Sequence, residues 1–402
     1  MLKEKPKALS LYREEVSAEL NSILNYWITH TVDQERGGFY GSVSNDNVPG
    51  KTAPKGIVLN SRILWAFSAA FLHTKEQQYL DIAERAYQYI TDHFIDQEFG
   101  GVYWSVDYKG TVLDGKKQIY GLAFCIYGLS EFYKASANDL ALSFANDLFK
   151  YIEQHSHDKV NGGYLEAFTR EWSVIDDLRL SEKDSNEKKT ANTHLHVIEA
   201  YANLYSASKN EHLGQQVNNL LAVFEKFIIN PVTFHLNLFL DEEWNVKSSL
   251  ISFGHDIEAA WLLLQCAEVT GDHSYVNRYK ELSLKLTDAA IEGLHTDGGL
   301  WYEYEPAESN LIKEKHSWPQ AEAMIGFMNA YQLANDEKYL EHSLNSWQFV
   351  KGSIKDQLNG EWFWGVDKNN LPMKNKDKAG FWKDPYHNSR ACLEIIRRIS
   401  EL

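Results

Sequence analysis

Cysteine and proline are scarce in this chain of 402 residues, and each scarcity narrows the possible structures. The three cysteines, Cys125, Cys266 and Cys392, lie far apart in apolar helical contexts and lack the spacing of a metal site. We therefore expect buried thiols in a reducing compartment rather than a disulfide framework. Only eight prolines occur, which favours long continuous helices because proline breaks the hydrogen-bonded ladder of a helix interior.

Long apolar runs and an excess of positive charge are also missing. No uninterrupted apolar run approaches the roughly 20 residues of a membrane-spanning helix, so no membrane partner is expected. The basic segment from Met1 to Arg13 lacks the apolar core of a signal peptide, which predicts a cytoplasmic protein. Because 40 Lys and Arg residues stand against 56 Asp and Glu, the net charge is −16, and this balance argues against a nucleic-acid partner.

Two nucleotide-binding motifs are absent from the sequence. Neither a glycine-rich phosphate loop nor a dinucleotide fingerprint occurs, which argues against redox chemistry through a bound nicotinamide. Aromatic residues, in contrast, are plentiful: 12 Trp, 22 Tyr and 19 Phe. Exposed Trp and Tyr side chains form flat apolar platforms with a polar edge, and such platforms suit sugar rings. Many aromatics, among them Trp65, Trp261 and Tyr201, are instead expected to pack between helices.

A glycine–aromatic signature recurs along the chain and divides it into units. Its members share one or two glycines followed by bulky apolar residues, and they lie at residues 37–40, 100–104, 162–164, 298–302 and 359–364. Neighbouring members are about 60 residues apart, except for one gap of about twice that length. The gap predicts a missing member near its middle, where the run Phe234 to Phe239 has the bulky residues without the glycines. The chain is therefore predicted to contain six units.

Helical patterns flank the signatures. Apolar residues recur three and four positions apart before the second signature, from Leu80 to Ile90, and after it, from Ile119 to Leu129. The glycines suit tight turns and the bulky residues suit short strands, so each unit is predicted to be helix, short β-hairpin connection, helix. Six such units can stack as an open solenoid or close into a ring. We favour closure, an all-α (α/α)6 barrel or toroid, because candidate polar clusters occupy similar positions in the units.

The domain organisation follows from the same pass along the chain. No linker rich in proline, glycine or serine interrupts the units, so residues 1–402 are expected to form a single catalytic domain. The connection from Arg170 to Lys189 is longer than the others. A loop of that length in a compact domain is more often a lid over a site than filler, and we expect a lid here.

Polar residues cluster directly after the β connections, where the inner helices of a closed ring begin. Four of these clusters are Leu59 to Trp65, Asn192 to Tyr201, Ser252 to Trp261 and Gly380 to Arg390. In the other two units, the same place is taken by Tyr120 and by the run Trp318 to Glu322. A ring brings these six places to one cavity.

The third-unit cluster begins Asn192-Thr193-His194-Leu195-His196. An Asn or Thr cap ahead of apolar residues is typical of a helix N-terminus. In such a helix Asn192 and His196 lie one turn apart on the same face, whereas His194 points away from His196. We expect Asn192 and His196 to face the cavity and His194 to pack in its wall. The residues alone leave open that both histidines are packing residues.

Histidine and carboxylate positions indicate the chemistry of the cavity. His255 and Glu258 are three residues apart, so the carboxylate can orient the imidazole on one helix face. A histidine can take and return a proton near neutral pH, and three candidates are available: His196, His255 and His387. They favour reversible proton transfer next to a carbonyl. The enediolate so formed needs fixed hydrogen-bond donors, for which the candidates are Arg62, Tyr120 and Asn192.

Three other kinds of site remain open from the residues alone. A metal site has His194, His196, His255, Asp256 and His387 as possible ligands, but no histidine pair four residues apart places two ligands on one helix face. A glycoside hydrolase needs two opposed carboxylates, and the candidates are Asp184, Glu258 and Glu322. A non-catalytic sugar-binding module needs the aromatics but leaves the histidines without a role.

Three sequence blocks resemble the cellobiose 2-epimerases of the N-acylglucosamine 2-epimerase superfamily. The blocks are Asn192 to Tyr201, Gly254 to Ala259, and the run Trp382-x-x-Pro385-Tyr386-His387. The resemblance covers essentially the whole chain, with the three motifs in order. It implies an (α/α)6 barrel, which agrees with the six units counted from the repeats.

The resemblance also implies an activity. Members of the family interconvert glucose and mannose at the reducing end of β-1,4-linked disaccharides such as cellobiose and lactose, without metal or cofactor. The sugar ring opens, the C2 proton is removed, the planar enediolate rotates, and the proton returns to its other face. By motif, the catalytic residues are His255, His387 and His196. The residues that match the family's substrate-binding pocket are Arg62, Tyr120, Asp184, Asn192, Glu258, Trp318 and Trp382.

Some assignments stay open within this resemblance. We assign His255 as the base at C2 and His387 as the group that opens and closes the ring, and these two roles can be exchanged. The match of Asp184 rests on its position in a loop rather than on a motif. Relatives that act on N-acetylglucosamine, mannobiose or free mannose share the histidines, so these substrates and a secondary aldose–ketose isomerase activity remain alternatives. The partner is expected to be a small-molecule sugar, and the protein a monomer.

Overall fold

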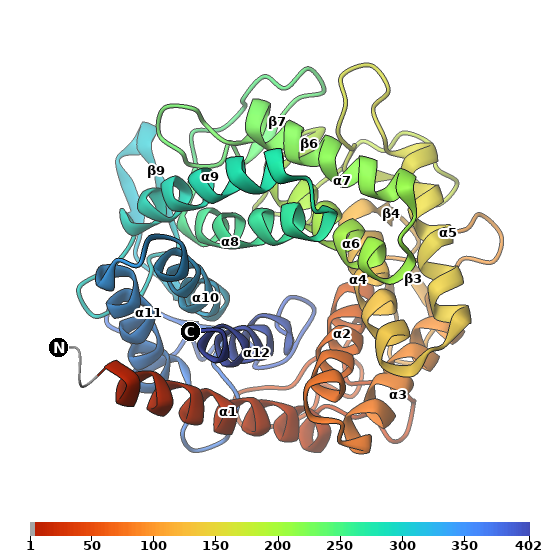
Figure 1. The fold of residues 1–402 in the computed structure, drawn as a ribbon. Helices are drawn as coiled ribbons and strands as arrows, with labels where there is room; N and C mark the ends of the chain where they lie inside the picture. The colour runs from red at the N-terminus through yellow and green to blue at the C-terminus, as the bar shows by residue number, and fades with distance from the viewer. Residues whose placement is uncertain (1–4) are drawn as a thin grey trace.

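Twelve α-helices form a closed double ring in residues 5–402, the part of the chain that the computed structural model describes (Figure 1). The inner helices are α2 (Ile57–Thr74), α4 (Ile119–Ser136), α6 (Ala191–Ser208), α8 (Phe253–Thr270), α10 (Ser317–Ala334) and α12 (Tyr386–Ser400). The outer helices are α1 (Lys5–His30), α3 (Gln77–His93), α5 (Asp139–His155), α7 (Glu211–Val223), α9 (His273–Ile291) and α11 (Glu337–Phe349). Each inner helix contacts the next, and α12 contacts α2, so the ring closes. Residues 1–4, part of the N-terminal segment expected to lack a signal peptide, lie outside the described residues.

Burial distinguishes the two rings. In α2 every residue from Ile57 to Ala70 is buried, and in α4 every residue from Ile119 to Phe132. The outer helix α3, in contrast, buries one stripe: Tyr79, Ala83, Ala86, Tyr89 and Ile90. A helix that is apolar all round belongs in the interior, whereas an amphipathic helix covers a surface. The predicted (α/α)6 barrel and both predicted helical patterns are confirmed.

A turn closed by one β-bridge follows each outer helix. The six bridges are Val32–Phe39, Ile95–Val102, His157–Tyr164, Ile229–Leu236, Leu294–Leu300 and Lys355–Trp362. The second residue of each bridge lies in one copy of the glycine–aromatic signature, and the fourth copy lies where the doubled gap predicted it. The six predicted units are therefore present.

Short strands then join each unit to its neighbour. The pairs are β1 (Lys55–Gly56) with β2 (Ser105–Val106), β4 (Lys117–Gln118) with β5 (Ala167–Phe168), β6 (Lys189–Thr190) with β7 (Phe239–Leu240), β8 (Ile251–Ser252) with β9 (Glu303–Glu305), and β11 (Lys315–His316) with β12 (Gly365–Val366). Two strands complete hairpins, β3 (Val112–Asp114) with β2 and β10 (Asn310–Ile312) with β9. Three single helical turns complete the elements: η1 (Phe224–Ile228), η2 (Pro306–Glu308) and η3 (Val350–Ile354).

The fourth signature keeps its turn without a glycine. In the other five, a glycine stands two residues before the bridge, at Gly37, Gly100, Gly162, Gly298 and Gly360, with φ from 74° to 87°. Phe234 takes this place in the fourth unit with a φ of 61°. A left-handed conformation costs a residue with a Cβ roughly 1–2 kcal/mol. Packing of the ring therefore imposes this turn against the local preference of the sequence.

Five of the six connections in residues 5–402 contain an ion pair between a buried lysine and an aspartate. The pairs are Lys55–Asp33, Lys117–Asp96, Lys189–Asp158, Lys315–Asp297 and Lys378–Asp356, with N–O distances from 2.5 to 3.0 Å. In the fourth unit, Asn230 takes the place of the aspartate and Ile251 that of the lysine. Both charges are lost together there, as expected because one unpaired buried charge is costly.

Two further expectations concern the state of the cysteines and the presence of membrane-spanning helices. The three cysteines are buried free thiols. No helix within residues 5–402 has the length and apolar character needed to cross a membrane.

The fourth unit suggests a test of the ion pairs. In the variant Lys55→Met, the Asp33 carboxylate loses its cation while its side chain is only 2% exposed, so we expect a loss of about 3–5 kcal/mol in the free energy of unfolding. In the double variant Lys55→Met/Asp33→Asn, which lacks both charges as the fourth unit does, the loss should be smaller. The introduced asparagine can still accept the two backbone N–H groups that Asp33 accepts, as Asn230 does in its own turn.

Urea unfolding of both variants and the wild-type protein measures the two losses. A double variant that is as unstable as the single variant would contradict the idea that the unpaired charge, rather than the lost packing, is costly.

Candidate active site

Apart from Asp184 and Trp382, which lie in connections, the predicted site residues lie in the first two turns of the inner helices. Counting from each helix start, the second residues are Val58, Tyr120, Asn192, Gly254, Trp318 and His387, and the sixth residues of α2 to α10 are Arg62, Phe124, His196, Glu258 and Glu322. Second and sixth residues lie one turn apart on one helix face. All six inner helices begin at the same end of the ring because each follows a β connection, so these faces meet at the axis.

Contacts among these side chains show the convergence. Arg62 donates from Nη2 to the Tyr120 hydroxyl oxygen over 2.8 Å, and the Tyr120 ring lies 5.1 Å from the His196 ring. Trp318 lies 4.9 Å from the ring of His255 and 5.5 Å from that of His387. The structure therefore brings residues from the inner helices together in two neighbouring groups.

The start of α6 differs from the sequence prediction in one detail. The helix is capped by Thr190, whose side chain accepts the Thr193 backbone N–H, so neither Asn192 nor Thr193 is the cap. Thr190 belongs to β6, and the pairing of β6 with β7 fixes the extended backbone of Thr190. Buried Glu166 accepts hydrogen bonds from the N–H and hydroxyl of Thr190 and from the hydroxyl of Thr193. Asn192 is consequently the second residue of the helix.

His194 packs in the wall, as predicted. Its Nε2 accepts the backbone N–H of Tyr164 over 2.9 Å, and its Nδ1 donates to the Thr190 carbonyl over 2.7 Å. Burial lowers the pKa of His194 to about 4, so the imidazole is neutral at pH 7. Both ring nitrogens are used, which leaves none for a metal ion or a substrate.

Arg62 is held rigidly beside the histidines. Its side chain is 4% exposed, and its Nη1 donates to Asp384 over 2.9 Å. The guanidinium also lies 4.1 Å from the centre of the Phe124 ring. Burial raises the pKa of Tyr120, so its hydroxyl stays protonated. Because that oxygen already accepts from Arg62, the Tyr120 proton remains for donation to another acceptor.

His196 and His387 are each backed by a carboxylate. The Nδ1 of His196 lies 2.9 Å from Glu199, and the Nδ1 of His387 lies 2.7 Å from Glu322. A carboxylate accepts the Nδ1 proton and leaves the Nε2 lone pair for other chemistry. Burial lowers the pKa of both histidines, so both imidazoles are neutral at pH 7.

The hydrogen-bond partner of His255 is not a carboxylate, so the prediction that Glu258 orients this imidazole is wrong. Its Nδ1 bonds the Ser252 hydroxyl over 2.8 Å, rather than Glu258. Glu258 instead accepts from Arg390 Nη2 over 2.6 Å and lies 4.0 Å from the Nδ1 of His387. Spacing along α8 placed His255 and Glu258 near each other, but the carboxyl group of Glu258 accepts a charge-assisted hydrogen bond from a guanidinium on α12 instead. Burial lowers the pKa of His255 to about 3.

Glu258 is protonated near neutral pH. Burial and the negative charge of Glu322 raise the pKa of Glu258 to about 8. Burial raises the pKa of Glu322 as well, but its hydrogen-bond partners, Arg390, His387 and the Trp261 indole N–H, can all donate to it, so Glu322 is the carboxylate of the two. A neutral Glu258 can donate a hydrogen bond as well as accept one.

Glu258, Glu322 and His387 offer potential ligand atoms within 4.8 Å of one another. Arg390 Nη2 donates to both carboxyl groups, over 2.6 and 2.7 Å. A metal ion bound here would have to displace this guanidinium. The expectation that no site residue is a metal ligand stays a prediction.

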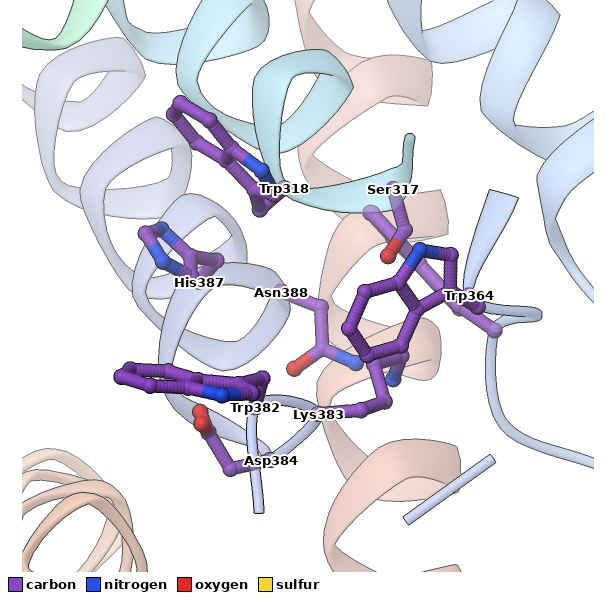
Figure 2. Close-up of a pocket in the computed structure, with 9 residues that line it drawn as sticks. Ser317, Trp318, Trp364, Trp382, Lys383, Asp384, His387 and Asn388 are labelled. Carbon is purple, nitrogen blue, oxygen red and sulfur yellow. The ribbon is translucent and has the colours of Figure 1, made fainter. Parts of the chain in front are cut away.

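Two tryptophans border the pocket beside His387. In the view of Figure 2, the His387 imidazole lies between the indole of Trp318 above and that of Trp382 below. Trp364, from the sixth connection, lines the same pocket, although the sequence pattern gave no reason to place it there. The close packing needs Gly254, since a Cβ there would lie 2.6 Å from the Trp318 ring.

Within residues 5–402, two predicted residues form no hydrogen bond with this cluster. Asp184 accepts two hydrogen bonds from Ser181 in its own loop. Asn192 lies one turn before His196, and among residues 5–402 its buried Oδ1 has no hydrogen-bond partner. The loop of Asp184 extends from the third unit to the fifth, where Lys183 bonds Tyr302 and lies 3.8 Å from Glu303. Its role as a lid stays a prediction.

Sequence reasoning did not assign a role to Glu199, Arg390 or Asp384, and it considered Glu322 only as a hydrolase carboxylate. Glu199, Glu322 and Arg390 are charged residues at buried positions of the inner helices. A charge at such a position must be paired, so its place in the helix is the signal that could have identified these residues. Their partners lie on other helices and could not be read from spacing.

Comparison with known proteins adds a similarity over the whole ring. The sequence profile of the N-acylglucosamine 2-epimerase (GlcNAc 2-epimerase) family matches residues 37–391. The cellobiose 2-epimerase of Bacteroides fragilis is 46% identical over 387 residues, which cover 96% of this chain and 99% of that protein. The solved cellobiose 2-epimerase of Spirochaeta thermophila has a TM-score of 0.93 at 37% identity, covering 99% of this chain and 98% of its own. That of Bacillus thermoamylovorans has a TM-score of 0.93 at 38% identity, covering 97% and 100%.

The buried Glu166 below α6 predicts a pH-dependent stability. Burial raises its pKa from 4.5 to about 8. A group whose pKa is higher in the folded state stabilises the protein fully below its unfolded pKa, and this contribution is lost as the pH rises through the folded pKa. Between about pH 4.5 and 8, we therefore expect the stability of Glu166→Gln relative to wild type to rise by up to about 1.4 kcal/mol per pH unit.

Urea unfolding at several pH values in this window measures the difference. Glu84→Gln, which changes an exposed glutamate on α3, is the control and should leave the pH dependence unchanged. A Glu166→Gln protein with the wild-type pH dependence would show that Glu166 is ionised in the fold.

Proposed function

Because the chain belongs to the N-acylglucosamine 2-epimerase family and is an isomerase-class enzyme, we propose that it interconverts glucose and mannose at the reducing end of β-1,4-linked disaccharides such as cellobiose and lactose. The observation that carries the proposal is the pair His255 and His387, on two helices, each in ring contact with Trp318. An indole between two proton-transfer groups suits a sugar ring whose C2 hydrogen is exchanged. Similarity to proteins named cellobiose 2-epimerase supports the choice of disaccharide.

Epimerisation at C2 removes the proton from one face of a planar enediolate and returns it to the other, and rotation of the enediolate lets a single base do both. We assign His255 as the base at C2, and His387 as the group that opens and closes the sugar ring; the exchanged assignment remains the alternative. Both imidazoles are neutral at pH 7 because burial lowers their pKa, and the neutral form is the one that accepts a proton. The negative charge that develops on the substrate then stabilises the new imidazolium.

The developing enediolate needs donors that do not move. Arg62 is fixed by Asp384, and Tyr120 keeps a free hydroxyl proton. Asn192 lies on the same side of the cavity, which we assign to the O1 and O2 oxygens, and the Nε2 of His196 can accept a hydroxyl proton there. Fixed donors in a buried site stabilise such charge without reorganisation, which is the main source of catalysis in sites of this kind. Neutral Glu258 is assigned to a hydroxyl of the sugar.

The hydrolase alternative fits this geometry poorly. A glycoside hydrolase places its two carboxyl groups on opposite sides of the scissile bond, at least about 5 Å apart. Glu258 and Glu322 instead bind the same nitrogen of Arg390, and Asp184 binds within its own loop. We also propose that the whole ring acts as one catalytic domain, since its first and last helices, α1 and α12, pack together.

The deciding experiment is incubation with cellobiose in D2O, followed by NMR. We expect glucosyl-mannose to form with deuterium at C2. Release of free glucose would identify a hydrolase and overturn the proposal. Reaction with N-acetylglucosamine, mannobiose or free mannose but not with cellobiose or lactose would keep the chemistry and refute the substrate.

Removing either proton-transfer histidine should abolish turnover. We expect His255→Asn and His387→Asn each to lower kcat by about 10²–10⁴-fold or more, since the proton then has no acceptor. His342→Asn, which changes a histidine on the outer helix α11, is the control and should keep wild-type activity. The variant that still exchanges deuterium at C2, if only one does, has lost the ring-opening group. Normal turnover in either site variant would exclude that histidine.

Metal removal should leave the activity unchanged. The cluster of Glu258, Glu322 and His387 has Arg390 as its counterion, so no metal is needed to balance it. We expect the same kcat/KM for cellobiose before and after exhaustive dialysis against a chelator. Loss of activity that a single added divalent ion restores would contradict this expectation.

A further inference from the structure

An arginine without a role in the steps above lies at the centre of the buried charges. Arg390 is on α12, and its side chain is 3% exposed. Three carboxyl groups from three other helices surround it: Glu199 on α6 at 2.5 Å, Glu258 on α8 at 2.6 Å and Glu322 on α10 at 2.7 Å. Each of these side chains is at most 3% exposed. The planar guanidinium contacts all three because its N–H groups diverge in one fork.

Two of the three carboxyl groups are the partners of site histidines. Glu199 binds His196 through Oε2 and Arg390 through Oε1. Glu322 binds both His387 and Arg390 through Oε1. The order His196, Glu199, Arg390, Glu322, His387 is therefore one continuous chain of hydrogen bonds across α6, α12 and α10.

We propose that Arg390 is a positioning residue for the epimerisation: it keeps Glu199 and Glu322 ionised, and through them it holds both imidazoles with Nδ1–H toward the carboxylate and Nε2 toward the sugar. The proposal rests on the proposed function for its kinetic readout. The structural part of the proposal can be tested independently of the proposed function, because the ring orientation and the proton position of each histidine can be measured without a substrate.

The charge balance supports this role. The Arg390 charge lowers the pKa of Glu199, which stands at about 2 although burial opposes this shift. Without Arg390, three buried carboxyl groups would face one another, and they could be accommodated only by taking up protons. A protonated Glu199 or Glu322 no longer requires a donor at Nδ1, so the histidine tautomer is no longer fixed.

Other charges around the two histidines do not replace Arg390. The groups that face His387 are Glu322, Glu258, Asp384, Arg62, Arg390 and His196. The groups that face His196 are Glu199, Tyr120, Arg62, Arg390 and His255. The other cation in these sets, Arg62, is paired with Asp384. Removing Arg390 therefore leaves the three glutamates without a cation.

The direction of the pH effect follows from the sign of the charge. Arg390 lowers the pKa of both His196 and His387. When it is replaced by a neutral residue, each histidine–glutamate pair holds an extra proton up to a higher pH, whichever of the two groups carries it. The form with an ionised carboxylate and a neutral imidazole is then available only at higher pH, so the acid limb of kcat/KM moves upward.

The test compares Arg390→Met and Arg390→Lys with Arg398→Met. Arg398 is a matched control: it lies on the same helix, is 7% exposed, pairs with Glu394 and, like Arg390, lies over the Trp261 ring. For Arg390→Met we expect kcat to fall by about 100-fold or more, with a smaller change in KM and an acid limb shifted up by about one pH unit or more. Arg390→Lys keeps the charge but not the fork, so kcat should fall while the acid limb moves less.

Arg398→Met should lose stability and keep the wild-type pH profile. If Arg390→Met shows the same pH profile as Arg398→Met, Arg390 is only structural and the proposal is wrong. Should the Arg390 variants not fold, Glu322→Gln and Glu199→Gln each break one link of the chain. We expect each to lower kcat by about 10–100-fold, and an unchanged kcat in both would overturn the proposal.

Imidazole 15N NMR of the substrate-free wild-type protein separates this proposal from the proposed function. We expect His196 and His387 to carry their proton on Nδ1 from about pH 6 to pH 8. Finding the proton on Nε2 would refute the proposal even if the enzyme epimerises cellobiose. Finding it on Nδ1 in a protein that epimerises no sugar would refute the function and keep the positioning role of Arg390.

Discussion

The site depends on charges buried where six inner helices begin. Each of these helices is surrounded by protein, so a charged side chain on it must find a partner within the ring. Arg390 pairs with three carboxyl groups, and Arg62 pairs with Asp384. These pairs tie helices from different units together at the axis. The same pairs leave the Nε2 atoms of His196 and His387 available, because the Nδ1 atoms bind carboxylates.

The architecture could be predicted because it repeats. A turn signature about 60 residues apart gives the number of units, and helical periodicity on both sides gives their content. The fourth unit shows the limit of such a pattern. Phe234 adopts the left-handed turn, and Asn230 and Ile251 stand where the other units have the ion pair. The fourth unit therefore lacks both the turn glycine and the lysine–aspartate pair, yet it keeps the fold. The neighbouring units hold this connection in place, and only the interval between signatures revealed it.

The site could be predicted less completely, for a physical reason. Position in a helix tells which face a residue occupies, and this was sufficient to place His194 in the wall. Position does not tell which of several possible partners the side chain on that face bonds. Glu258 is three residues from His255 but bonds Arg390, which is 132 residues away. Similarly, β6 moved the cap of α6 to Thr190, because pairing with β7 decides where the strand ends and the helix begins.

Equivalent positions with different side chains turn a symmetric ring into an asymmetric site. The sixth residue of the inner helix is Arg62 in the first unit, His196 in the third and Glu258 in the fourth. In a ring of six units, the first and fourth face each other, so a cation stands across the axis from the protonated Glu258. In the reaction that we propose, a planar, negatively charged intermediate between them would be drawn toward Arg62, while Glu258 could meet it as a neutral donor. The repeat thus determines how far along its helix each side chain lies. The different residues at one repeated position determine the direction of the electric field across the site.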